Sequence, residues 1–152
     1  MGRVIFSFTV AGIPKPKGSK RAFVVQPKGG NPRAVLVESA GDALSEWMDR
    51  IRSAARLVAP EALLECPVQV SISFRMVRPK CDMKRGGDLK DDAPRAHTKA
   101  PDIDKLARAA LDALQGVMFR DDSQVCALSL VKRYEAAGTP PGAHFRVETD
   151  AG

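Results

Sequence analysis

The chain has 152 residues, of which 44% are hydrophobic and 28% charged, the size and composition of one globular domain. Lysine and arginine outnumber aspartate and glutamate by 24 to 18, and the resulting net charge of +6 favours a polyanionic partner such as nucleic acid. No apolar run reaches the roughly 18–20 residues that span a bilayer, so we expect no membrane contact. The three widely spaced cysteines suit neither a zinc finger nor a disulfide framework, and we therefore expect a cytoplasmic protein.

The first half of the chain predicts a strand, a loop and a helix. Residues 4–10 alternate between apolar and polar side chains, which is typical of a strand. Residues 12–34 are rich in proline, glycine and lysine, and predict a basic, mobile loop with a short hairpin around Ala22–Val25. Apolar residues at helical spacing then predict an amphipathic helix over residues 40–58.

The second half predicts three strands around one helix. Strict alternation over residues 68–76 indicates a strand, and the polar, basic segment 78–100 is expected to be a second mobile loop. A helix is predicted from about 103 to 115. Residues 124–134 are apolar on both faces, which favours a central strand, and a last strand is expected near 143–149.

These elements follow the order β-α-β-α-β-β. They predict one domain over residues 1–152, of the α/β class (α+β type), with a mixed β-sheet and two main helices. Charge is distributed unevenly along this domain, because residues 1–37 contain seven lysines and arginines and no acid. We expect the basic segments to contact phosphates.

Two acidic motifs carry the clearest chemical signal. Asp102 and Asp104 mark the start of the predicted helix, where Asp102 would be the N-cap outside the regular helix. Asp121 and Asp122 precede a strand, and the connector from Gly116 is just long enough to return Asp122 to the other two aspartates. Three such carboxylates suit Mg²⁺ or Mn²⁺, which prefer oxygen ligands.

Each of these residues also has a purely structural interpretation. Aspartate at a helix start is favoured by capping and by the helix dipole, and a double aspartate before a strand is common in turns. Arg108 lies one helical turn from both Asp104 and Asp112, so it either binds a phosphate or forms a surface ion pair. The sequence leaves both alternatives open.

A larger pattern links these motifs. Residues 101–114 read PDIDKLARAALDAL, and DDSQV at 121–125 and then Lys132 follow them. Together these residues resemble the signature of the RusA Holliday junction resolvases. Residues 10–21 are similar to the basic N-terminal loop of that family, and the segment 97–99 also fits.

The resemblance implies a mixed α/β fold and a homodimeric, Mg²⁺-dependent endodeoxyribonuclease of a class common in phages and prophages. Such an enzyme resolves four-way DNA junctions in recombination and repair. Mn²⁺ is expected to substitute for Mg²⁺, and no nucleotide cofactor is expected. The resemblance implies catalytic and metal-binding roles for Asp102, Asp104 and Asp122, with Asp121 as a weaker additional metal ligand.

The sequence departs from the family pattern at two positions. The family usually has Asn where this chain has Lys105, and Lys where it has Arg108. A guanidinium holds a phosphate but is a poor proton donor, so either residue is a candidate for the catalytic role of the family lysine. The DNA contacts that we expect are Lys15, Lys17, Lys20, Arg21, His97, Lys99 and Lys132.

The main rival interpretation is a non-catalytic basic module that binds branched or single-stranded DNA, in which the carboxylates only cap a helix and form a turn. An RNA-binding adaptor has less support. Only eight aromatic residues are present, and none interleaves with the basic segments as a stacking platform requires.

Overall fold

The computed structural model describes residues 2–18, 21–37, 41–136 and 138–150. The predicted order of strands and helices is confirmed for the main sheet and the two helices. The structure also contains a separate two-stranded sheet. Residue 40, the predicted start of the first helix, lies outside the described residues. The elements are β1 (Ile5–Ala11), β2 (Arg21–Val25), β3 (Arg33–Val37), α1 (Gly41–Arg56), β4 (Val68–Met76), η1 (Lys80–Asp82), α2 (Ile103–Leu114), η2 (Asp122–Gln124), β5 (Val125–Tyr134) and β6 (Gly142–Thr149).

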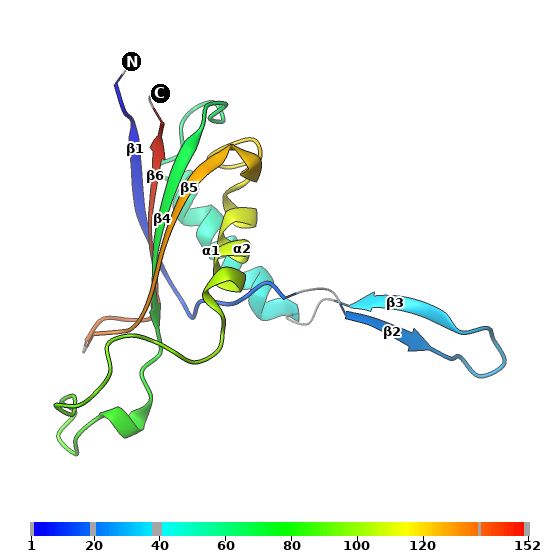
Figure 1. Cartoon of the computed structure of the whole chain (residues 1–152), viewed down its shortest axis with the longest axis horizontal. Helices are drawn as coiled ribbons and strands as arrows, with labels where there is room; N and C mark the ends of the chain where they lie inside the picture. Colours follow the sequence, from blue (N-terminus) through cyan, green and yellow to red (C-terminus); the bar gives the residue numbers. More distant parts are fainter. Residues whose placement is uncertain (1, 19–20, 38–40, 137, 151–152) are drawn as a thin grey trace.

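The main sheet has four strands in the order β1-β6-β4-β5. The pairs β1–β6 and β6–β4 are antiparallel, and β4 and β5 are parallel. Parallel neighbours need a crossover connection. The chain therefore leaves the end of β4, passes through α2 and returns to the edge of the sheet where β4 began, and there it starts β5. Both helices lie on one face of the sheet (Figure 1).

The prediction that residues 124–134 form a central strand is wrong, because β5 lies at the edge of the sheet. Its first half carries small or exposed side chains, among them Ala127 and Ser129. The last strand, β6, instead inserts between β1 and β4. Strand order depends on pairing between distant segments, which the local apolar pattern does not encode.

The core lies between the sheet and the two helices. Trp47 and Ile51 of α1 are buried, as are Leu106 and Leu114 of α2. They pack against the alternate side chains of the sheet, including Phe145, as the helical and strand periodicities predict. Burial of both apolar faces fixes α2, and with it the acidic residues at its start.

The strands β2 and β3 form an antiparallel hairpin that projects away from the sheet and helices (Figure 1). The sequence predicted only a short hairpin within a loop. The hairpin carries Arg21, Lys28 and Arg33 and no acidic residue, and Val24 is largely exposed on it. It is therefore a basic arm that exposes at least part of its apolar side chains.

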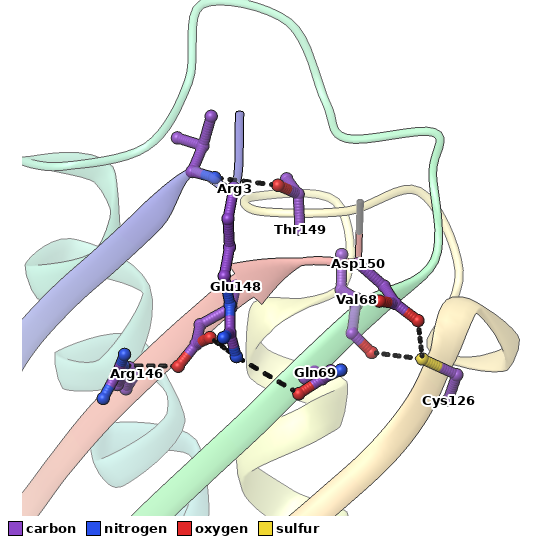
Figure 2. A network of polar contacts seen from close by, with 9 residues as sticks. Arg3, Val68, Gln69, Cys126, Arg146, Glu148, Thr149 and Asp150 are labelled. Carbon is purple, nitrogen blue, oxygen red and sulfur yellow. Dashed lines mark hydrogen bonds and ion pairs between the residues drawn. The ribbon is translucent and has the colours of Figure 1, made fainter. Parts of the chain in front are cut away.

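A polar network closes the end of the sheet where both termini lie (Figures 1 and 2). Among the described positions, Glu148 of β6 is the one buried charged residue. Its carboxylate pairs with the guanidinium groups of Arg3 and Arg146, and Arg3 also approaches Gln69 of β4. The network joins the segment before β1 to the two central strands.

Candidate metal-binding and DNA-binding site

The start of α2 presents two carboxylates. Asp102 is the N-cap, as predicted, but its side chain makes no capping hydrogen bond. Its carboxylate is exposed and lies 3.3 Å from the ammonium of Lys105. Asp104 follows in the first turn and is also exposed. The capping interpretation of the Asp102 side chain therefore fails, and the side chain is accessible to a ligand.

Two hollows meet at Asp104. The first, of about 470 Å³, lies at the start of α2 and is lined by Asp102 and Asp104 together with residues 97–100 and Lys132. The second, of about 310 Å³, lies between α2 and η2. Its polar lining residues are Asp104, Arg108, Asp112 and Asp122. Asp104 thus shares one hollow with Asp102 and the other with Asp122.

A cluster of three carboxylates around one ion is not formed. Among the described residues, no three His, Cys, Asp or Glu side chains are grouped closely enough to hold a metal ion together. Asp102 and Asp122 line different hollows, with Asp104 between them. The donor chemistry still fits Mg²⁺, because this ion commonly binds one or two carboxylates and completes its shell with water and substrate phosphates.

Asp121 and Asp122 have different environments. The Asp121 carboxylate accepts a hydrogen bond from the Ser123 backbone N–H at 2.8 Å and caps η2. This hydrogen bond lowers the pKa of Asp121. The Gln124 side chain completes the capping box and also donates to the carbonyl oxygens of Leu64 and Cys66. Asp121 therefore has a structural function, and it leaves Asp122 exposed at the edge of the second hollow.

The cations around α2 differ in whether they have an ion-pair partner. Lys17 is half-buried, and its ammonium lies 2.6 Å from the Asp112 carboxylate, while its backbone N–H donates to the carbonyl oxygen of Lys105. Arg108 forms no ion pair among the described residues. The ion-pair alternative for Arg108 is therefore not observed, and Arg108 lines the hollow that is also lined by Asp104 and Asp122.

The other predicted DNA contacts are dispersed. Lys15 lines a further hollow of about 460 Å³ with Asp102 and Lys105. Lys20 lies outside the described residues, and Arg21 begins the projecting hairpin. The sequence grouped these cations in one basic loop, whereas the structure distributes them between the body and the arm.

His97 and Lys132 are less accessible than the sequence suggested. The His97 ring packs edge-on against Tyr134, with 4.8 Å between ring centroids. Burial, and then the neighbouring charge of Lys132, lower the pKa of His97. The Lys132 ammonium donates to the backbone carbonyl oxygens of Lys99 and Pro101. No sequence pattern signals this use of Lys132, since the acceptors are main-chain atoms.

Comparison with known proteins identifies the protein family. The family model described as "Endodeoxyribonuclease RusA" matches residues 14–147. This match spans nearly the whole domain, so the chain belongs to the RusA family of endodeoxyribonucleases, as its motifs indicated. The family comprises Holliday junction resolving enzymes that bind branched DNA and generally depend on a divalent metal.

A relative in Bacillus subtilis (strain 168), described as "Uncharacterized protein YqaN", is 27% identical over 130 residues. The alignment covers 84% of this chain and 86% of that protein. Within the part of the chain that the structure describes, no helix is both long and apolar enough to cross a membrane.

Proposed function

We propose that the protein is a structure-selective endodeoxyribonuclease that resolves four-way DNA junctions by Mg²⁺-dependent phosphodiester hydrolysis, in recombination or repair in the cytoplasm. The observation that carries this proposal is the accessibility of Asp102 and Asp104 at the start of α2, in a chain of an endodeoxyribonuclease family. Both carboxylates open into a hollow that is also lined by cations.

The proposed metal ligands are drawn from Asp102, Asp104 and Asp122, of which one or two carboxylates would bind a given ion, with Asp104 central because it borders both hollows. When bound, Mg²⁺ or Mn²⁺ would lower the pKa of a water and offset negative charge on the phosphoryl oxygens. The predicted role of Asp121 as an additional ligand becomes indirect here, since its carboxylate caps η2 and orients Asp122. No nucleotide cofactor is required.

Arg108 is proposed to bind the scissile phosphate. It lines the same hollow as Asp104 and Asp122, and its guanidinium is not occupied by an ion pair among the described residues. Because a guanidinium does not give up its proton, Arg108 supplies charge only. Lys105, beside Asp102, is the better candidate for a proton donor to the leaving oxygen.

The remaining DNA contacts are proposed for the basic surface around these hollows and for the hairpin. Lys15, Lys99 and His97 lie near the start of α2, Arg21 is the first residue of β2 in the arm, and Lys20 directly precedes it in the sequence. Such contacts release counterions, so junction affinity should fall steeply with salt. A homodimer would offer two sites to opposed strands of one junction.

The test is cleavage of a synthetic four-way junction with Mg²⁺, with EDTA and with a linear duplex as controls. We expect Asp104→Asn to retain junction binding and to lose cleavage. Asp42→Asn is a matched control, because Asp42 is an exposed acid in the first turn of α1. It should cleave normally. Binding without any Mg²⁺-dependent nicking by the wild-type protein would instead favour the non-catalytic DNA-binding module.

A further inference from the structure

The segment before α2 is attached to the edge strand of the sheet. Residues 95–97 run beside the last residues of β5, with Ala96 paired antiparallel to Arg133. Two backbone hydrogen bonds secure this pairing, from Tyr134 N–H to the Arg95 carbonyl at 2.9 Å and from His97 N–H to the Lys132 carbonyl at 3.2 Å. This attachment ends five residues before Asp102.

The Lys132 side chain spans the remaining distance. Its ammonium donates to the carbonyl oxygens of Lys99 and Pro101, each at 2.7 Å. Pro101 directly precedes the N-cap Asp102, whose own carbonyl accepts the first helical hydrogen bond, from Leu106 N–H at 3.1 Å. The two contacts therefore fix the backbone immediately before the first carboxylate of the site.

These contacts use most of the donor capacity of the ammonium. A lysine ammonium has three N–H donors, and two of them are directed at main-chain carbonyls. Hydrogen bonds from a charged donor are roughly twice as strong as neutral ones. The Lys132 side chain is only partly exposed, so solvent competes weakly for it. In contrast, the Lys99 side chain is exposed beside the same hollow.

We propose that Lys132 is a positioning residue, which holds the 99–101 backbone and thereby sets Asp102 and Asp104 in the arrangement that a divalent ion requires. This inference rests on the proposed function of the two carboxylates. It replaces the direct phosphate contact that the sequence suggested for Lys132. Residues that orient metal ligands commonly change metal affinity by about 10- to 100-fold when they are substituted.

The experiment compares Lys132→Met with Lys99→Met, because the second substitution keeps the carbonyl acceptor and removes a neighbouring exposed charge. Mn²⁺ binding is measured without DNA by the electron paramagnetic resonance signal of the free ion. Junction affinity is measured in EDTA across a series of salt concentrations. Lys132→Met should weaken Mn²⁺ binding about tenfold and leave the salt dependence of junction binding unchanged.

The control should show the opposite behaviour. Lys99→Met should bind Mn²⁺ normally and reduce the slope of log affinity against log salt by about one, as loss of one phosphate contact predicts. If Lys132→Met shows that slope change and retains Mn²⁺ affinity within about twofold, Lys132 is a phosphate contact and the proposal is overturned. Should Lys132→Met not fold, Lys132→Gln keeps an uncharged NH₂ group with two N–H donors and should give a smaller loss of Mn²⁺ affinity.

Amide hydrogen exchange separates this inference from the nuclease assignment. In the metal-free protein, Lys132→Met should speed exchange of the His97 and Leu106 amides, while exchange in the core of α1 remains unchanged. If the wild-type protein neither binds Mn²⁺ nor cleaves junctions, the proposed function fails even when this exchange result holds. Unchanged exchange at both amides would show that Lys132 does not anchor the segment.

Discussion

The half-buried pair between Lys17 and Asp112 gives a quantitative test of how the N-terminal basic segment is held against α2. The ammonium and carboxylate lie 2.6 Å apart, and their side chains are 30% and 27% exposed. Exposed ion pairs contribute roughly 0.2–1 kcal/mol, and hydrogen bonds to charged groups about 1.5–3 kcal/mol. At this intermediate exposure we expect a coupling free energy of about 1 kcal/mol.

The assay is a double-mutant cycle with Lys17→Met, Asp112→Asn and the combined variant, each unfolded in urea. The combined variant should be about as stable as the less stable single variant, because the pair is lost in both. The pair of Arg52 and Asp49 within α1, in which the carboxylate is 72% exposed, is the control, with an expected coupling of about 0.3 kcal/mol. A Lys17–Asp112 coupling within about 0.3 kcal/mol of zero would refute the reasoning.

Three further predictions concern pH and charge burial. Since the pKa of His97 is lowered, its stabilising contribution is complete above its ordinary pKa of 6.5 and is lost as the pH falls through the lowered value. His97→Gln should therefore flatten the decline of unfolding free energy between pH 7 and 5, and an equal decline in both proteins would contradict this. The Ser123 amide chemical shift should titrate with a midpoint below pH 3.8, and the titration should be absent in Asp121→Ala; a midpoint at or above 3.8 would exclude the capping contact as its cause. Glu148→Ala leaves two guanidiniums that reach water, so it should cost only about 1 kcal/mol in urea unfolding, whereas removing both arginines leaves a buried unpaired carboxylate and should cost about 3 kcal/mol. The reverse order would be inconsistent with the burial of Glu148.

The periodicity of the sequence was sufficient to predict the elements of the main sheet and both helices. Residues 68–76 alternate strictly because one face of β4 packs against the helices, and the predicted and observed bounds of this strand agree. The amphipathic helix predicted from about 103 to 115 was recognised for the same reason, and it is observed over Ile103–Leu114. In both cases the local pattern directly reflects which side chains are buried.

Long-range pairing was not predictable in the same way. The insertion of β6 between β1 and β4 depends on contacts between the ends of the chain, and β3 is recognised only by its pairing with β2. The strand over 33–37 is short and begins within the segment rich in proline, glycine and lysine that was predicted as a loop over 12–34. Strand order therefore had to come from the structure.

At the candidate site, the sequence predicted which acids begin α2 but not how their neighbours are engaged. It ranked Asp121 below Asp122 as a metal ligand but did not predict that the Asp121 carboxylate accepts the capping hydrogen bond. It also treated Lys17 and Lys132 as free cations, although one pairs with Asp112 and the other with backbone carbonyls. Such partners are set by tertiary contacts, which residue type and spacing do not determine.

The location of the single tryptophan decides what optical unfolding experiments can detect. Trp47 is buried beneath α1, so its fluorescence reports on separation of the helices from the sheet. The β2–β3 arm projects away from the sheet and helices (Figure 1) and packs chiefly on itself. An isolated two-stranded hairpin is only marginally stable. Melting of the arm would therefore be silent in tryptophan fluorescence, and following it by fluorescence requires a separate reporter on the hairpin.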